Sequence, residues 1–294
     1  MQRKPPRLPP NEPDFGHQGI DSLDELVRCA FSTTRELTIG TGTTKRKQDS
    51  KILWMVEQQA EDAYAVRKIN SQFVPVGEET IITGDKLFRE FTPEVEIHLT
   101  KVEPAMVKLH RTLERGDLHR LVGERDEAEL EYSSALEIDE LNVRAIFGLG
   151  IVLAQRGAKR RAKAVFRDIV KLDAAFNEEH KHLFNEFGIS LRKAKLFDEA
   201  VQYYTRAMEL TESDDHLHYN MARVHYELGQ WGECADHLDH SLRLNGELEE
   251  AVMLCKLILA MHLDRKVLDK YGKPPIPDEV GKLVDELIKD GSRT

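Results

Sequence analysis

The chain has 294 residues and a formal net charge of -10 at neutral pH. Hydrophobic residues make up 40% and charged residues 32%, a composition that suits a soluble helical protein. No apolar run approaches the ~18 residues of a membrane-spanning helix, and the acidic balance argues against a general nucleic-acid binder. The length favours about two domains.

The first 19 residues are rich in proline and polar groups, which predicts a disordered tail. Basic residues occur there without an apolar stretch after them, so we do not expect a secretory signal. Cys29, Cys234 and Cys255 are an odd, widely spaced set, which favours a reducing compartment over a disulfide framework. We therefore expect a cytoplasmic protein.

Residues 20–103 have the pattern of a short helix followed by a small β module. An apolar stripe predicts a helix over 21–31, and the polar stretch 32–50 predicts a loop with at most one strand at 36–39. Strand-like runs follow at 51–57, 63–69, 72–76 and 80–83, and 84–91 is a short helix or turn. An isolated two-stranded hairpin is marginal, so we expect the module to lean on the first helices that follow.

The region 104–262 repeats itself four times. Small residues recur at Ala128, Ala162, Ala200 and Cys234, with successive spacings of 34, 38 and 34 residues. A period of this length, with two short helical patterns in each unit, is typical of a helical solenoid. Such a solenoid buries a core by stacking its repeats and leaves an extended curved surface. Surfaces of this kind bind other proteins far more often than they catalyse reactions.

This region resembles the tetratricopeptide repeat family, in a bacterial form with a short β module before the repeats. The family places small residues where paired helices touch, because only small side chains let two helix axes approach closely. Aromatic and apolar residues then interlock the helices. The matching positions are Gly116, Gly150, Gly188 and Ala222, then Ala128, Ala162, Ala200 and Cys234, then Tyr132, Phe166, Tyr204 and Leu238, and finally Ala135, Ile169, Ala207 and Ser241.

Some positions depart from the family pattern. Glycine stands in the turn of three units, but Lys195 replaces it in the third, which suggests a differently shaped turn. Arg115 stands in the first unit where an apolar residue is usual. The four extra residues between the second and third units fall near 174–180. No unit has the proline that the family favours after its second helix.

The sequence therefore predicts a mainly α fold. It consists of an α-solenoid of four helix hairpins over 104–262 and C-terminal capping helices over 263–294. A small antiparallel β module over 20–103 precedes the solenoid, after the tail 1–19. Pro104 can start the first solenoid helix. A last amphipathic helix follows the proline-rich stretch 271–277, and we expect it to fold back over the open end of the stack.

In this family the first helix of each unit lines a concave groove, and helical spacing selects the residues that face it. Met253, Leu257 and Met261 extend the same line with apolar groups. The predicted groove is basic and aromatic, so it favours a partner segment with carboxylates and apolar anchors. The predicted groove residues are Arg144, Phe147, Ile151, His182, Asn185, Arg192, Lys193, His216, Tyr219, Arg223 and Tyr226.

The resemblance implies a non-catalytic adaptor or scaffold whose partner is another protein. Two alternatives remain open: a chaperone for a secreted or assembly subunit, and a sensor whose β module binds a ligand or single-stranded nucleic acid. The second rests on the basic residues 45–47 beside Trp54, but nearby acidic residues make nucleic acid an unfavoured partner. Homo-oligomerisation through the apolar stretch 253–261 is also open.

No catalytic motif is present: the sequence has no phosphate loop, nucleophile elbow or HExxH. We predict no enzymatic activity, no cofactor and no metal site. Histidines are frequent, but pairs two residues apart, such as His216 and His218, point to nearly opposite sides of a helix. His237 and His240, three residues apart, are spaced to share a face.

One subclass of the family grips the C-terminal carboxylate of heat-shock chaperones. Two of the matching places hold Asp117 and Glu186, which would repel a carboxylate. We therefore do not expect that role.

Overall fold

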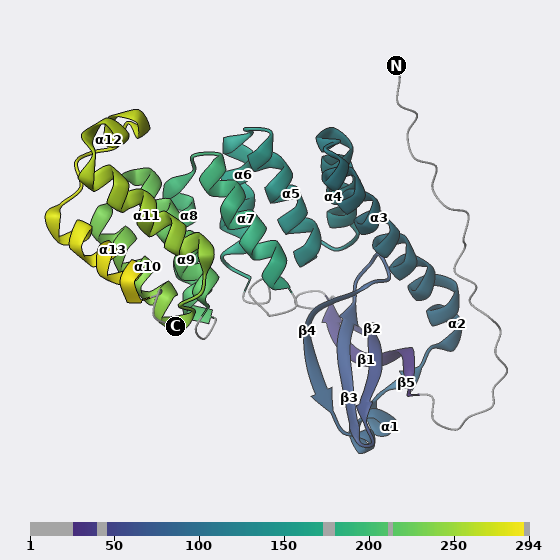
Figure 1. Ribbon diagram of the computed structural model, residues 1–294. Helices are drawn as coiled ribbons and strands as arrows, with labels where there is room; N and C mark the ends of the chain where they lie inside the picture. Colours follow the sequence, from purple (N-terminus) through teal and green to yellow (C-terminus); the bar gives the residue numbers. More distant parts are fainter. Residues whose placement is uncertain (1–25, 40–45, 173–179, 211–213, 291–294) are drawn as a thin grey trace. The chain divides into compact units, whose positions relative to one another are not determined.

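The computed structural model describes residues 26–39, 46–172, 180–210 and 214–290 (Figure 1). Its internal contacts divide the chain into two units. The β unit takes in the chain up to Lys68 together with Glu78–His98, and the helical unit takes in Ile69–Gly77 and the chain from Leu99 onward. The residue bounds of the four predicted segments stay a prediction, as does the expectation that the β module leans on the helices.

The β unit holds a five-stranded sheet in the order β4-β3-β2-β1-β5. Strand β1 pairs antiparallel with β2 and β5, and β2 pairs antiparallel with β3. The buried core joins one sheet face to helix α1 and consists of Phe31, Val56, Tyr64, Val66, Ile82 and Leu87. The elements are β1 Arg28–Ile39, β2 Arg46–Ala60, β3 Ala63–Ile69, β4 Pro75–Ile82, α1 Gly84–Glu90, β5 Thr92–Pro93 and α2 Val95–Ile97.

The start of this unit corrects the sequence prediction. The helix predicted over 21–31 is wrong from residue 28, where β1 begins, and most of the predicted loop 32–50 is strand in β1 and β2. Phe31 lies opposite Trp54, while Ala30 lies opposite Met55 on the other face of the sheet. Because both faces bury apolar groups here, the expected alternation is lost and the residues resemble a helical stripe. Residues 21–25 and 40–45 lie outside the described residues.

The later predictions for this unit are largely confirmed. Strand β3 has the predicted bounds. The two strands predicted at 72–76 and 80–83 are instead a single strand, β4 Pro75–Ile82, and residues 72–74 belong to the turn before it. The turn before β4 is built on Asn70, whose side-chain oxygen accepts hydrogen bonds from the backbone of Gln72 and Val74. By its contacts this turn belongs to the helical unit, where Asn70 also donates a hydrogen bond to the carbonyl of Ile138.

The helical unit is a solenoid of antiparallel helix pairs, as predicted (Figure 1). The π-helical turn His98–Val102 leads into α3, whose first turn contains Pro104. The first helices of the units contact one another in the series α3, α5, α7 and α9. The pairs are α3 Glu103–Val122 with α4 Arg125–Ile138, α5 Val143–Gln155 with α6 Lys159–Ile169, α7 Lys181–Lys193 with α8 Phe197–Leu210, and α9 Asp215–Leu228 with α10 Trp231–Leu244.

The recurring small residues lie where the prediction placed them. Ala128, Ala162, Ala200 and Cys234 each expose 0% of their surface. Four bulky residues, each four positions further on, are also buried: Tyr132, Phe166, Tyr204 and Leu238. The rings of Tyr132 and Tyr204 pack against the small residues of the first helices, Gly116 and Gly188. The repeat pattern therefore reports a real packing constraint, which is close contact between paired helices.

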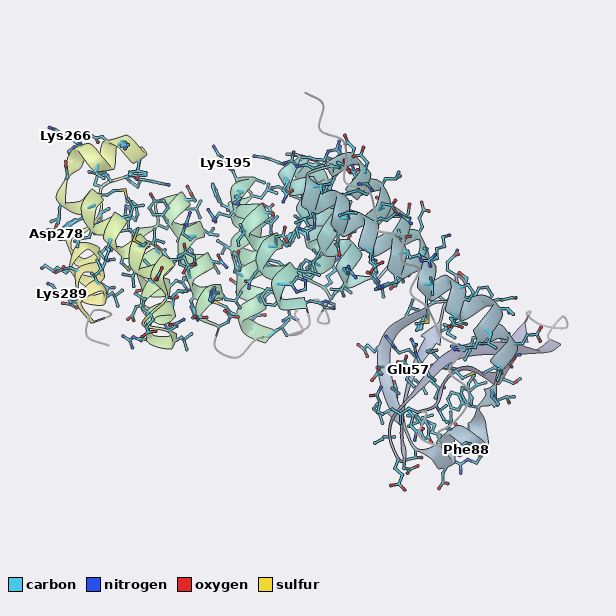
Figure 2. The ribbon with its side chains drawn as sticks, turned by 45° about the vertical axis from the view of Figure 1, so that its right-hand side comes forward. Glu57, Phe88, Lys195, Lys266, Asp278 and Lys289 are labelled. Atoms are coloured by element: carbon cyan, nitrogen blue, oxygen red, sulfur yellow. The ribbon has the colours of Figure 1, made fainter. Side chains whose placement is uncertain are left out.

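The turn at Lys195 corrects a second prediction. Lys195 has φ 59°, in the left-handed region where Gly123, Gly157 and Gly229 also lie. Its amide donates to the carbonyl of Arg192, which repeats the bond that Gly157 makes to Ala154. The turn therefore keeps its shape although the residue is not glycine, and the Lys195 side chain points outward from the end of the hairpin (Figure 2).

Replacing Lys195 by glycine should stabilise the helical unit by about 0.5–1 kcal/mol, because a side chain in the left-handed region costs energy that glycine avoids. Gly157→Ala is the matched control. No atom lies within 4 Å of an added Cβ there, so the change tests backbone conformation alone and should destabilise by a similar amount. Urea unfolding at constant m-value measures both. A loss of stability in Lys195→Gly would contradict the argument.

The solenoid ends in three helices, α11 Glu249–Leu263, α12 Arg265–Tyr271 and α13 Asp278–Asp290. As predicted, the last helix folds back: α13 contacts α11 and α10, and buries Val280 and Val284. An added Cβ at Gly281 would clash with the ring of His262, so the two helices approach closely. Within the described ranges, no helix combines the length and apolar character needed to cross a bilayer.

Deleting residues 275–294 should uncover the apolar face of α11 and cause self-association. The deletion removes the buried groups Ile276, Val280 and Val284, which belong to the same buried apolar cluster as Leu254 and Ile258 of α11. Exposed apolar surface of this kind drives association or aggregation. Light scattering coupled to size exclusion, with the full chain as control, should show a rise in mass; an unchanged monodisperse mass would count against α13 as a cap.

Candidate functional site

A pocket of about 780 Å³ lies between α9 and α11, beside the segment that follows α12. We call it the α9–α11 pocket. Its wall is partly apolar, since Leu257 is half-buried and Met253 exposes 64% of its surface. The lining residues are Tyr219, Arg223, Tyr226, Glu227, Glu249, Glu250, Met253, Leu254, Leu257, Tyr271 and Lys273.

Arg223 is the main cation of this pocket. One terminal nitrogen donates to the hydroxyl of Tyr219 at 3.0 Å, and the guanidinium carbon lies 6.0 Å from the centre of the Tyr219 ring. No carboxylate among the described residues forms an ion pair with Arg223, and its Nε is buried without a hydrogen-bond partner. A half-buried guanidinium without an acid favours a carboxylate or another anion from outside the chain.

A second arginine from the neighbouring repeat reinforces this charge. Arg192, on α7, exposes only 12% of its side chain and lies 3.7 Å from a carboxylate oxygen of Glu227. Burial and then the positive charge of Arg223 lower the pKa of Arg192, which shows that the two guanidinium groups are close. Two like charges held together are unfavourable unless an anion lies between or beside them.

Glu227 is shared among the cations. Lys273 donates to the Glu227 backbone carbonyl at 3.0 Å and lies 3.3 Å from its carboxylate, while its ammonium group also lies 4.6 Å from the centre of the Tyr226 ring. The Glu227 carboxylate therefore forms ion pairs with both Arg192 and Lys273. Glu249 and Glu250 line the same pocket and are exposed, and neither forms an ion pair with Arg223 among the described residues.

Several buried polar atoms around these arginines have no hydrogen-bond partner in the described chain. They are Arg192 Nε, Tyr204 Oη and Arg223 Nε. Buried polar groups are nearly always satisfied in native proteins. A group of three without partners therefore indicates a place where water or the polar atoms of a bound segment complete the hydrogen bonding.

The structure brings together part of the predicted groove. Tyr219, Arg223 and Tyr226 line the pocket, and Arg192 lies beside it. His182, Lys193 and His216 are exposed on α7 and α9 but do not line the pocket, and Asn185 is half-buried.

Two predicted groove residues belong to the core instead. Phe147 and Ile151 expose 0% of their surface, and the Phe147 ring packs edge-on against Phe187 at 5.8 Å. Met261 is likewise 1% exposed. The prediction placed one face of each first helix in the groove, but α5 is buried almost all round because α4, α6 and α7 pack against it.

Arg144 is present on the surface but is already neutralised. Its Nε donates to Asp117 at 2.7 Å, and a terminal nitrogen also bonds the same oxygen. Asp117 additionally accepts a hydrogen bond from the Tyr132 hydroxyl at 2.5 Å. Arg144 is therefore a structural partner in the first two repeats, and the charge available to a ligand lies further along, at Arg192 and Arg223.

Sequence reasoning missed Tyr271 and Lys273. Both lie at or after the end of α12, outside the repeats, and reach the pocket only because the chain turns back there. Trp231 helps to fix this segment, since its indole nitrogen donates to the carbonyl of Pro274 at 3.1 Å. The contact joins residues far apart in the sequence, so no local pattern could indicate it.

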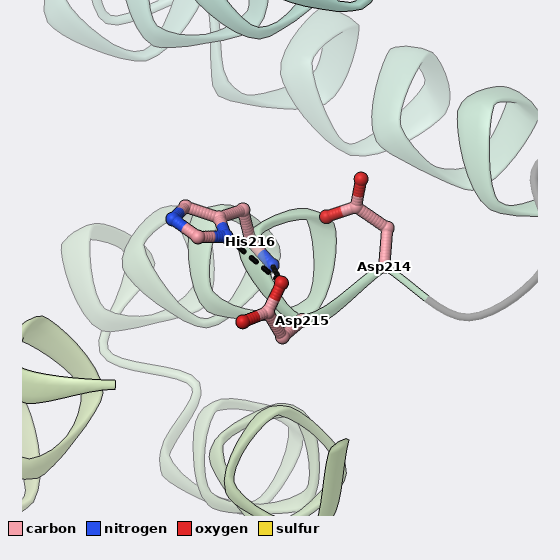
Figure 3. Close-up of side chains that lie close together, drawn as sticks. All are labelled: Asp214, Asp215 and His216. Atoms are coloured by element: carbon pink, nitrogen blue, oxygen red, sulfur yellow. Dashed lines mark hydrogen bonds and ion pairs between the residues drawn. The ribbon is translucent and has the colours of Figure 1, made fainter. Parts of the chain in front are cut away.

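Asp214, Asp215 and His216 form the one group of three metal-ligating side chains found close together in the described parts of the chain (Figure 3). The carboxylate oxygens of both aspartates accept hydrogen bonds at the start of α9. Asp214 caps α9 by accepting from the amide of Leu217 at 3.0 Å, and Asp215 accepts from His216 at 2.8 Å and from Asn245 at 2.7 Å. This geometry is a helix start, where acidic groups are favoured.

The β unit has its own pocket of about 580 Å³, lined in part by Trp54, Phe91 and Lys86. The Trp54 indole nitrogen donates to Thr33 at 2.9 Å, and its ring meets Phe91 edge-on at 6.0 Å. Trp54 therefore packs within the unit, although it also lines the pocket. The side chains of residues 45–47, on which the nucleic-acid alternative depends, lie outside the described residues.

Comparison with known proteins gives partial likenesses of low identity or short extent. No family model matches the chain. The curated relatives include Hsp70-Hsp90 organizing protein 2 from Arabidopsis thaliana and Hsp70-Hsp90 organizing protein from Triticum aestivum, each 36% identical over 63 residues. The match covers 21% of this chain and 11% of each relative, so the chain spans about a tenth of the length of these proteins.

Solved structures with a similar fold include MamA from Desulfovibrio magneticus RS-1, with 17% identity, a TM-score of 0.44 and coverage of 63% of this chain and 94% of that one. PilF from Pseudomonas aeruginosa has 20% identity, a TM-score of 0.41 and coverage of 63% and 76%. A thermophilic TPR protein from Thermus thermophilus has 17% identity, a TM-score of 0.40 and coverage of 61% and 98%. These likenesses are too distant to transfer a function.

Proposed function

We propose that the protein is a non-catalytic adaptor or scaffold whose helical unit, a solenoid of the tetratricopeptide type, binds a segment of another protein. The segment lies along the first helices of the third and fourth repeats and ends in the α9–α11 pocket. It carries at least one carboxylate, which pairs with Arg223 and Arg192, and an apolar side chain, which packs on Met253 and Leu257.

The observation that supports this proposal is the unbalanced charge of Arg223. Arg144 has its own carboxylate partner, and Arg192 and Lys273 share Glu227. Only Arg223 combines burial of Nε, lack of an acidic partner in the described chain and a position in the largest of the pockets described above. An arginine held in a partly desolvated site beside an aromatic ring and an apolar wall resembles the anchor points of protein interfaces.

The proposal is tested by placing a photo-reactive benzophenone side chain at Leu257 and irradiating the full chain in native cells. Thr205, an exposed position on α8, is the matched control. We expect one dominant protein to crosslink from position 257, to do so weakly from position 205, and to be lost when Arg223→Glu is added. Equal crosslinking from both positions, or a crosslink unaffected by Arg223→Glu, would refute the pocket as the binding site.

The same experiment separates the adaptor from a chaperone for a secreted or assembly subunit. A chaperone would give one exported client that stays bound during purification, whereas an adaptor gives a partner that persists in the same compartment. Self-association gives a crosslink to a second copy of this chain, and mass spectrometry of the crosslinked product identifies which of these it is.

A further inference from the structure

Four histidines of the fourth repeat form a cluster that the proposed function does not use. His218 and His225 lie on α9, and His237 and His240 lie on α10. The ring centres of His218 and His237 are 5.4 Å apart, those of His218 and His240 are 5.2 Å apart, and those of His225 and His237 are 5.6 Å apart. His218 therefore lies in contact with both histidines of the HxxH pair on α10.

The closest contact in this cluster joins two metal-ligating atoms. Nδ1 of His218 and Nδ1 of His237 are 3.1 Å apart and share a hydrogen bond, so one of them carries a proton that a metal ion would displace. Two nitrogens bound to one tetrahedral Zn²⁺ at about 2.0–2.1 Å lie roughly 3.3 Å from each other. Helices α9 and α10 thus already hold this pair at a chelating separation.

The other two histidines have one ring nitrogen fixed by a hydrogen bond. His240 Nδ1 lies 2.7 Å from the carbonyl of Asp236, and His225 Nδ1 lies 2.8 Å from the side-chain oxygen of Gln230. A carbonyl oxygen only accepts, so Nδ1 carries the proton in the assigned tautomers and Nε2 keeps its lone pair.

The surroundings favour the neutral ring that metals require. Burial, together with the neighbouring imidazoles, lowers the pKa of His237 to about 4, and burial also lowers the pKa of His218. An ion bound here needs neutral rings and the release of the proton that the two Nδ1 atoms share. Access exists as well, because His218 and the exposed His240 line a pocket of about 260 Å³ that also includes Asp214.

We propose that His218, His237 and His240 form a site for a transition-metal ion that prefers imidazole ligands, with Zn²⁺ as the reference ion. In the described parts of the chain the nitrogens of the three rings do not all lie within 4.8 Å of one another. The Nδ1 atoms of the first two rings lie at the separation of shared ligands. His240, which is exposed, completes the site when its side chain turns and gives up its bond to the Asp236 carbonyl. A bound ion would tie α9 to α10 in the repeat that carries Arg223.

The test is calorimetric titration of the full chain with Zn²⁺ at neutral pH after chelator treatment. We expect one saturable site, lost or weakened at least about tenfold in His218→Gln and in His237→Gln. His240→Gln should weaken binding less, and His110→Gln, on α3, should have no effect. Zn²⁺ should also raise the Tm of the unaltered chain but not that of the first two variants.

Far-UV circular dichroism confirms that the variants are folded, and His216→Gln tests the rival group at the start of α9. Loss of the site in His216→Gln, or binding by the unaltered chain no tighter than by the double variant His218→Gln/His237→Gln, would overturn the proposal.

Discussion

Replacing Gly148 by alanine should lower the free energy of unfolding by about 2 kcal/mol. A Cβ at Gly148 would lie under 3.0 Å from three atoms of the Tyr132 ring, closer than real Cβ atoms come. The ring has no room to move, because Tyr132 is 0% exposed and its hydroxyl is hydrogen-bonded to Asp117 and Arg120. Overpacking of this kind costs about 1–3 kcal/mol or more, and exceeds the gain of about 1 kcal/mol from a better helix former.

Gly232→Ala is the matched control for this prediction. Gly232 is also helical, but nothing lies within 4 Å of an added Cβ. There the propensity gain acts alone, so the change should stabilise the protein by up to about 1 kcal/mol. Chemical denaturation of both variants therefore gives shifts of opposite sign. If Gly148→Ala were neutral or stabilising, Gly148 would not be needed for the close approach of helices.

The same contact explains why the solenoid could be predicted from sequence. Small residues such as Ala128, Ala162 and Ala200 recur because a larger side chain at each place would push paired helices apart. The constraint acts between helices that follow one another in the chain, as Tyr132 of α4 shows by packing against Gly116 of α3 and Gly148 of α5, and it recurs in each repeat. A local requirement that recurs at a fixed period is the kind of information that a single sequence retains.

The β unit was harder to predict because its strands depend on partners far along the chain. Residues 28–31 resemble a helix when considered alone, and become strand only because β2 pairs beside them. At Lys195, too, tertiary packing overrides a local conformational preference. Intrinsic preference disfavours lysine in the left-handed region, yet the packing of α7 against α8 imposes that conformation.

The candidate site was predicted only in part, for a geometric reason. Helical spacing gives the residues that share a face, but it does not say how many faces a helix buries. Helix α9 leaves Tyr219 and Arg223 at a pocket, whereas α5 is enclosed and takes Phe147 into the core. Two features depend on the tertiary fold, and no local sequence pattern indicates them: the position of Lys273 at the pocket, and the contact between His218 and His237.

Arg223→Ala should weaken binding of the crosslinked partner segment by about 2–4 kcal/mol, or roughly 30- to 900-fold, because truncation leaves the buried carboxylate of the segment unpaired. The folded chain itself should not be destabilised. The change removes a charge that has no acidic partner in the described residues and that lies close to Arg192. Loss of binding without loss of stability distinguishes an anchor from a structural arginine.

Glu227→Gln should act in the opposite direction. It frees Arg192 and Lys273 from the one carboxylate that they share, which makes the pocket more positive, and should strengthen binding by up to about 1 kcal/mol, or roughly fivefold. Arg243→Ala, at an exposed ion pair on α10, should leave the affinity unchanged. Fluorescence anisotropy with the labelled segment measures all three variants at two salt concentrations. Weaker binding by Glu227→Gln would mean that Glu227 contacts the segment directly, and the carboxylate assigned to the partner would then have to be replaced by a cation.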